Sequence, residues 1–274
     1  MLRSIARGLL TIADRMERQT AADSPFGNAP QADRATYLAL YEKARQAAYP
    51  EIDAIEAESG FAIDRGFLDG LALHTQVVVK KSALAWPHGR VLYALLRDYI
   101  RRAGGVGQLT VLETGTARGF SALCMARALT DSGTGGTILT FDTLPHDRAI
   151  HWNVIDDNDG PRTRRELLAP WHDLIAAHVV FVWGDTRVTL HRVMPERVHF
   201  AFLDGQHDYP SVIAEFEHVA ARQQSGDMIV FDDVTPDRYP GIVKAVAEIG
   251  ATRGYKVRPL SARADRQYAI ATKA

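Results

Sequence analysis

Acidic side chains and one histidine follow two short apolar segments in the second half of the chain. Leu203–His207 reads L-D-G-Q-H and Phe231–Val234 reads F-D-D-V. If the two segments are neighbouring parallel strands, Asp204, Asp232 and Asp233 meet at one rim, where they repel one another unless a cation or protons intervene. Hard divalent ions such as Mg²⁺ prefer oxygen ligands of this kind. The spacing therefore predicts a metal site, and the alternative is that each Asp caps the helix that follows it.

His207 lies three residues after Asp204, so we expect it at the same mouth. A free imidazole titrates near pH ~6.5, which suits a general base at neutral pH. Metal coordination lowers the pKa of a bound hydroxyl, so such a base would be adequate. We predict that His207 is a base or a metal ligand, and the alternative is a structural histidine.

A glycine-containing turn follows an earlier apolar segment. Residues 113–121 read E-T-G-T-A-R-G-F-S, in which Gly115 and Gly119 allow a tight turn and a close backbone approach. The amides of the next helix and the Ser121 hydroxyl could hold a carboxylate or a phosphate. The dinucleotide pattern G-x-G-x-x-G is absent, and a plain strand-to-helix turn remains the alternative.

Two more strand ends carry residues suited to a nucleoside. Asp142 ends an apolar run, and a carboxylate there can accept hydrogen bonds from both ribose hydroxyls, although it could instead form a turn. Gly184 and Asp185 end another run and would lie beside the adenine.

The elements that position these residues alternate along the chain. Apolar runs at 109–112, 138–141, 179–183, 198–203 and 228–231 predict strands, and helical spacing is found at 120–129, 212–220 and 242–249. Segments 255–260 and 267–271 predict a closing hairpin whose last strand is antiparallel. We expect an α/β, doubly wound, mostly parallel sheet over residues 105–274, with ligands at the carboxyl ends of its strands.

The first 104 residues read differently. Helical spacing covers residues 2–16, 33–58 and 91–104, whereas 77–79 could be a strand or a loop. We predict a helical N-terminal extension that covers the pocket, forms a dimer interface, or both.

Composition excludes several classes of protein. With 46% hydrophobic and 24% charged residues among 274, the chain is not predominantly disordered. Its 32 basic and 33 acidic residues argue against a nucleic-acid partner. The single cysteine, Cys124, excludes an intramolecular disulfide and fits a reducing cytosol. Neither a membrane-spanning run nor a signal peptide is recognisable, so we expect a cytoplasmic protein with no membrane partner.

Together, these motifs resemble those of class I S-adenosylmethionine-dependent methyltransferases. More narrowly, they are similar to the metal-dependent O-methyltransferases of small molecules, which include catechol, caffeoyl-CoA and macrolide-sugar enzymes. The most specific stretch is L-D-G-Q-H-D-Y-P-S through F-D-D-V. The resemblance covers roughly residues 85–274 and implies a seven-stranded Rossmann-like sheet.

The resemblance also implies roles for individual residues. Those implied to bind S-adenosylmethionine are Glu113, Gly115, Thr116, Gly119, Ser121, Asp142, Gly184 and Asp185. Asp204, Asp232 and Asp233 match the positions that bind Mg²⁺ or another divalent cation, with Asp204 and His207 as catalytic residues. Catechol-type members have lysine where this chain has His207, whereas macrolide-sugar members have histidine.

The expected reaction is transfer of a methyl group to a hydroxyl of a small molecule of sugar, polyketide or phenolic type. The N-P-P-Y signature of amino-group methyltransferases is absent after the fourth strand. Two alternatives remain: a methyltransferase fold with non-methyl, hydroxylase-like chemistry, and a nicotinamide-dependent oxidoreductase. We expect a homodimer or a higher homo-oligomer; the sequence names neither the acceptor nor the methylated position.

Overall fold

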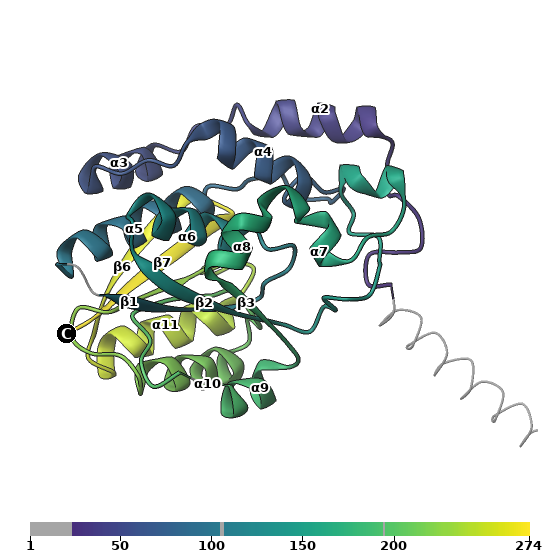
Figure 1. The fold of residues 1–274 in the computed structure, drawn as a ribbon. Helices are drawn as coiled ribbons and strands as arrows, with labels where there is room; N and C mark the ends of the chain where they lie inside the picture. Colours follow the sequence, from purple (N-terminus) through teal and green to yellow (C-terminus); the bar gives the residue numbers. More distant parts are fainter. Residues whose placement is uncertain (1–23, 105–106, 194) are drawn as a thin grey trace, which may run out of the picture.

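One seven-stranded sheet organises the molecule. The computed structural model describes residues 24–104, 107–193 and 195–274 (Figure 1). The strands are β1 (Gln108–Thr114), β2 (Gly135–Asp142), β3 (Val179–Trp183), β4 (Phe200–Leu203), β5 (Met228–Phe231), β6 (Tyr255–Arg263) and β7 (Arg266–Lys273). Their order is β3-β2-β1-β4-β5-β7-β6, and β7 is antiparallel to both its neighbours while β1–β5 pair in parallel. The prediction of a doubly wound, mostly parallel sheet with a closing hairpin is confirmed.

Helices cover both faces of this sheet (Figure 1). One face carries α9 (Thr186–Arg192), α10 (Tyr209–Ala220) and α11 (Pro240–Thr252). The other carries α5 (His88–Arg102), α6 (Phe120–Asp131) and α8 (His172–His178). An outer layer of α2 (Arg34–Ala44), α3 (Pro50–Ser59) and α4 (Arg65–Thr75) lies beyond α5 and α6. The sheet is therefore enclosed between helices on both faces.

The prediction of a single helix over residues 33–58 is wrong, because the structure has two helices there, α2 and α3. The helix is broken between Ala44 and Pro50, and a new one begins where Pro50 occupies its first turn. Proline lacks an amide hydrogen and is tolerated there but not in a helix interior. Helix α4 was not predicted, and residues 77–79 form no strand. The predicted helix over residues 2–16 lies outside the described residues.

The helices before β1 share a hydrophobic core with the sheet. Tyr37 and Ile52 from the outer layer and Leu92 from α5 are fully buried in the same cluster as Phe200 and Phe202 of β4. The described part of the helical extension is thus packed on the sheet. The division at residue 104 stays a prediction.

The connection between β2 and β3 is more structured than its polar sequence indicates. It contains η1 (Ile155–Asp159), α7 (Arg164–Leu167) and η2 (Ala169–Trp171) before α8, and Ile150 bridges to Arg162. Trp152, fully buried, gives this segment a small core of its own.

Among the described residues, no helix has the length and apolar character needed to cross a membrane.

Candidate functional site

The glycine turn after β1 is pressed against the end of β4. Gly115 has φ 85°, and a Cβ placed there would lie 2.0 Å from the carbonyl oxygen of Asp204. Gly119, with φ 89°, precedes α6 and faces Leu168. Only glycine combines this conformation with this close approach at position 115. The turn and the Asp204 strand end therefore form one unit.

Asp142 fixes the second strand end. Its Oδ2 accepts a hydrogen bond from the Ala117 backbone N–H over 2.5 Å, and its Oδ1 accepts one from the Leu144 N–H over 2.6 Å. The carboxylate thus links the glycine turn to the chain after β2. These two bonds leave lone pairs of both oxygens for a ligand.

Residues from four strand ends line one cleft of about 170 Å³. The cleft is formed by Gly115, Phe141, Asp142, Thr143, Gly184, Asp185, Thr186, Asp204, Gly205 and Gln206. The structure therefore brings together four of the residues predicted for the cofactor, namely Gly115, Asp142, Gly184 and Asp185. Glu113, Thr116, Gly119 and Ser121 are outside this lining.

Glu113 lies behind the cleft, fully buried. One of its oxygens accepts a hydrogen bond from Thr140, and the other, Oε1, has no partner. Burial raises the pKa of Glu113 to about 7, although the Ser121 and Thr140 hydroxyls oppose this shift. Thr116 also reaches this group, because its hydroxyl lies 2.5 Å from that of Thr140.

Asp185 caps α9 and lines the cleft. Its carboxylate accepts a hydrogen bond from the Arg187 backbone N–H over 2.9 Å and pairs with the Arg187 guanidinium at 2.5 Å. Asp185, which the sequence analysis assigned to the adenine side, therefore also stabilises the start of α9 through Arg187.

Glu215 is a site-supporting residue that sequence reasoning missed. Buried in α10, it accepts hydrogen bonds from the Thr114 and Thr186 hydroxyls, each over 2.8 Å. Burial raises its pKa. It joins the ends of β1 and β3 beneath Gly205, whose Cβ position would be 2.7 Å from Glu215 Oε1. The available signal was an acidic residue on the apolar face of the predicted helix, beside Val212 and Phe216.

Asp204, His207 and Asp233 form the candidate metal cluster. One ligand atom from each lies within 4.8 Å of the others. His207 Nε2 is 3.4 Å from Asp204 Oδ1 and 3.6 Å from Asp233 Oδ2, and this buried atom has no hydrogen-bond partner. Asp233 adopts φ 53°, a conformation that side chains rarely take and that is found at functional sites.

Burial and the neighbouring carboxylates act in opposite directions on the pKa of His207. Burial lowers the pKa of His207, but the adjacent carboxylates of Asp204, Asp233 and Asp232 outweigh it, so the net shift of the pKa is upward. The His207 ring also stacks on Tyr239 at 4.5 Å between centroids.

Asp232 is placed differently from the other two aspartates. Its Oδ2 accepts a hydrogen bond from Arg266 Nη2 over 2.5 Å, and its Oδ1 accepts one from the Asp233 backbone N–H over 2.7 Å. The structure therefore groups Asp204 and Asp233 with His207 and pairs Asp232 with Arg266, a residue that the sequence analysis did not single out.

Comparisons with known proteins agree with this architecture. The family model of a methyltransferase domain matches residues 112–234, which include both the glycine turn and the aspartate pair after β5. No curated protein matches the sequence at a significant level.

Solved structures share the fold at low sequence identity. An O-methyltransferase from Bacillus cereus, in complex with S-adenosylhomocysteine, has 18% identity and a TM-score of 0.51, over 83% of this chain and 93% of that one. The S-adenosylmethionine complex of TomG, an O-methyltransferase from Streptomyces achromogenes involved in tomaymycin synthesis, has 17% identity and a TM-score of 0.52, over 78% and 92%. The methyltransferase PaMTH1 of Podospora anserina, bound to S-adenosylhomocysteine, has 14% identity and a TM-score of 0.54, over 81% and 94%.

Proposed function

We propose that this chain, which has the fold and a domain of the class I S-adenosylmethionine-dependent methyltransferases, is an O-methyltransferase of small molecules. One observation carries the proposal: Asp204 lines the cleft and also belongs to the cluster with His207 and Asp233. A methyl donor in the cleft would therefore lie next to groups that bind and deprotonate a hydroxyl. The acceptor would be of sugar, polyketide or phenolic type.

The cleft suits the donor in several ways. Gly115 leaves room for a close backbone approach, and the Asp142 carboxylate can still accept hydrogen bonds from a ribose. Gly184 and Asp185 line the part of the cleft that would hold the adenine, and Glu113, Thr116, Gly119 and Ser121, outside the cleft lining, would contribute to the methionine side. Phe141 adds an apolar wall to the cleft.

The cluster fits a divalent cation, Mg²⁺ or another. The unpartnered His207 Nε2, buried between two carboxylates, is the kind of polar atom that a further ligand or proton would satisfy. Asp204 and Asp233 would hold the cation, and Asp232 would support Asp233 from its pair with Arg266. When bound, such an ion lowers the pKa of a coordinated hydroxyl and orients it.

His207 would then remove the proton of the acceptor. Its Nε2 accepts the hydroxyl hydrogen while the hydroxyl oxygen forms a bond to the methyl carbon, whose bond to sulfur breaks to leave S-adenosylhomocysteine. The imidazolium so formed is stabilised by Asp204 and Asp233, both within 3.6 Å of Nε2. Positioning the two reactants can contribute about 7–11 kcal/mol to such a transfer.

The helical extension would close the acceptor side of the site. Tyr37 of α2 donates a hydrogen bond to Asn153 over 3.1 Å, and Asn153 exchanges two hydrogen bonds of 3.0 Å with the backbone of Val79. Arg34 pairs with Asp159 at 2.8 Å. These contacts hold α2 and the loop around Val79 against the β2–β3 connection, consistent with a cover over the pocket.

The first experiment is a melting curve with S-adenosylhomocysteine, with NAD⁺ and with neither, each with and without Mg²⁺. A ligand at 100 times its dissociation constant adds about 2.7 kcal/mol to the stability of the folded state, which shifts the Tm by a few degrees. A shift with S-adenosylhomocysteine alone supports the proposal, and a shift with NAD⁺ alone would instead favour an oxidoreductase. Methyl transfer from labelled S-adenosylmethionine to a panel of hydroxyl compounds then separates a methyltransferase from a hydroxylase-like relative.

A further inference from the structure

A cavity of about 710 Å³ lies between α2 and the loop that follows α4. We call it the basic groove; its charged lining residues are Lys43, Lys80, Lys81 and Arg263. Among the residues that the structure describes, no carboxylate lines it. Because the whole chain has a net charge of -1, this local excess does not reflect the average composition. The volume lies within the range of pockets that bind molecules larger than a single sugar ring.

The lysines of the basic groove differ from Arg263 in their ion pairing. Within the described ranges, Lys43, Lys80 and Lys81 form no ion pair, whereas Arg263 pairs with Asp265 at 3.0 Å. Three unpaired ammonium groups around one cavity repel one another, and an anion placed among them would relieve that repulsion.

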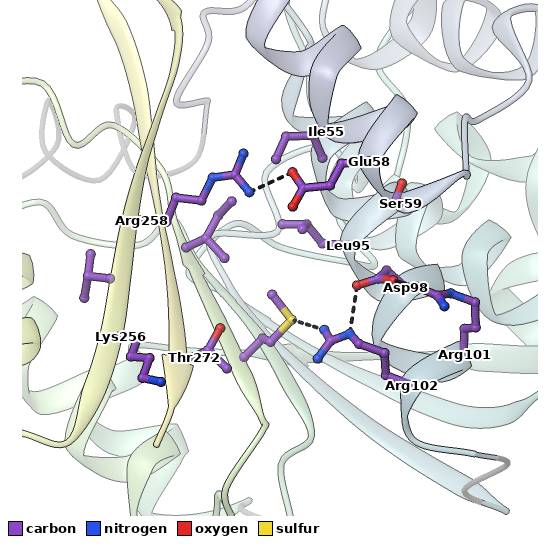
Figure 2. A pocket seen from close by; sticks show the side chains of 13 residues that line it. Ile55, Glu58, Ser59, Leu95, Asp98, Arg101, Arg102, Lys256, Arg258 and Thr272 are labelled. Atoms are coloured by element: carbon purple, nitrogen blue, oxygen red, sulfur yellow. Dashed lines mark hydrogen bonds and ion pairs between the residues drawn. The ribbon is translucent and has the colours of Figure 1, made fainter.

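A second cavity offers a comparison within the same molecule. Figure 2 shows the cavity of about 480 Å³ between α3, α5 and the β6–β7 hairpin, which also contains several cations. There, however, Arg258 pairs with Glu58 at 2.9 Å and Arg102 pairs with Asp98 at 2.8 Å (Figure 2). Of the four cations that line that cavity, the three arginines each have a carboxylate partner and Lys256 has none among the described residues, whereas in the basic groove Arg263 is paired and the three lysines are not.

The basic groove continues toward the candidate metal cluster. Ser82 lines it and also lines a neighbouring cavity of about 400 Å³, whose other lining residues are Thr235, Asp237, Arg238, Ala264 and Asp265. Thr235 belongs to the same loop as Asp233, and its N–H donates to the Asp233 carbonyl over 2.7 Å. A ligand in the basic groove can therefore extend to the loop that carries Asp233.

Charges near the basic groove and in the candidate metal cluster both affect the pKa of Lys80. Loss of hydration at the cavity wall lowers its pKa, and the positive charges of Arg266 and Arg238 lower it further. Asp233 acts in the opposite direction. The charge of Lys80 is thus coupled to that of Asp233 as well as to those of Arg266 and Arg238.

We propose that the basic groove binds the methyl acceptor through a phosphate group. This rests on the proposed function, because it assigns the hydroxyl of the same molecule to the cluster at Asp204. Several lysines acting as point charges suit a phosphate, whereas a lone carboxylate is matched by one bidentate arginine. The acceptor class is therefore a phosphorylated or diphosphate-linked hydroxyl compound, with its phosphate separated from the methylated hydroxyl by a spacer.

Inorganic pyrophosphate is the probe for the groove, with binding to the full-length protein measured by calorimetry at low ionic strength. The test variant is Lys80→Glu/Lys81→Glu, and the matched control is Lys244→Glu/Lys256→Glu, two exposed lysines away from the groove. We expect the test variant to bind pyrophosphate at least tenfold more weakly, the control to stay within twofold, and salt to weaken binding to the native chain. Lys43→Glu provides an independent variant should the double change impair folding.

S-adenosylhomocysteine binding is measured in parallel on each variant. If the native chain binds S-adenosylhomocysteine but not pyrophosphate, or if Lys80→Glu/Lys81→Glu binds pyrophosphate as well as the control, the acceptor inference is overturned and the proposed function stands. If S-adenosylhomocysteine does not bind, the proposed function itself has failed. Acceptor pairs that differ only by a phosphate or by a carboxylate at the same position complete the test: a lower KM for the phosphate form supports the inference, and a preference for the carboxylate form contradicts it.

Discussion

Arg266 on β7 donates a hydrogen bond to Asp232 at the end of β5 over 2.5 Å, and the Asp232 side chain is only 1% exposed. Because the second Asp232 oxygen accepts the Asp233 N–H, both of its oxygens are engaged within the chain. Arg266 also donates a hydrogen bond to the Tyr268 hydroxyl over 2.8 Å. The carboxylate-rich rim thus contains a cation of its own, which leaves Asp204 and Asp233 as the carboxylates that face His207.

Removing the Arg266 guanidinium should have opposite effects on stability and on cation affinity. In Arg266→Met, the buried Asp232 loses its partner, and breaking such a pair costs about 3–5 kcal/mol of unfolding free energy. The freed carboxylate should at the same time strengthen binding of Mn²⁺, measured by electron paramagnetic resonance. The control is Arg266→Met/Asp232→Asn, which should recover stability in urea unfolding and lose the gain in affinity. Unchanged Mn²⁺ affinity in the single variant would show that Arg266 does not tune the cluster.

The pair of Arg266 and Asp232 could not be predicted from the sequence. Asp232 was found because it follows an apolar strand, and a strand end is local information. Its partner comes from β7, which the chain places antiparallel beside β5 only after α11 and β6 have intervened. No spacing rule connects residues 232 and 266, so the contact required the three-dimensional register of Val230 with Ile270.

The alternation of apolar strands and helices predicted the sheet well because burial on both faces produces long apolar runs. The boundaries of the outer helices were harder to predict from the sequence. Because α2 and α3 are mostly exposed, they contain few buried apolar positions, and their helical spacing reads as one continuous helix. The β2–β3 connection was read as polar, yet Asp157 is buried there and accepts a hydrogen bond from the Trp152 N–H over 2.8 Å. Polar residues that satisfy buried backbone groups are not distinguishable from solvated ones by composition.

Replacing Asp204 should separate chemistry from cofactor binding. Asp204→Ala removes a carboxylate of the cluster while the backbone that contacts Gly115 remains. We expect methyl transfer to be abolished and S-adenosylhomocysteine binding to be largely retained, as measured by calorimetry. The exposed Asp173→Asn, on α8, is the control and should keep full turnover. Undiminished turnover in Asp204→Ala would remove the basis for the metal cluster.

His207 is tested by turnover at saturating substrate. If its Nε2 accepts the hydroxyl proton, His207→Ala should lower kcat by about 10²–10⁴-fold, the usual contribution of a general base. KM for the methyl donor should change little, because His207 does not line the cleft. His191→Ala, an exposed histidine on α9, should behave as the native protein. A loss smaller than tenfold at position 207 would assign that residue a structural role.

Gly115 permits a prediction about the glycine turn with a matched control. In Gly115→Ala, the new Cβ would lie 2.0 Å from the Asp204 carbonyl oxygen, so the turn must move away from β4. Gly133→Ala introduces a comparable left-handed strain, at φ 61°, but its Cβ meets open space. Strain alone costs about 1–2 kcal/mol. We expect both variants to lose stability, and only Gly115→Ala to lose S-adenosylhomocysteine affinity, by at least tenfold; equal affinities would mean that the turn does not border the cofactor.

Glu113 makes stability depend on pH in a direction opposite to that of a salt-bridged carboxyl. Burial raises its pKa from 4.5 to about 7, so between these values the folded state binds more protons than the unfolded one. Stability must then fall as pH rises through this window, by about 3 kcal/mol in total for a shift of this size, and level off above it. Glu113→Gln carries no titrating group at this position, so its free energy of unfolding should lose this pH dependence. In urea unfolding, its stability relative to the native chain should therefore increase as pH rises from 5 to 8. The control is Glu42→Gln at an exposed position, and its stability should depend on pH as that of the native chain does. If the stability of Glu113→Gln also follows the native pH dependence, Glu113 ionises with an ordinary pKa.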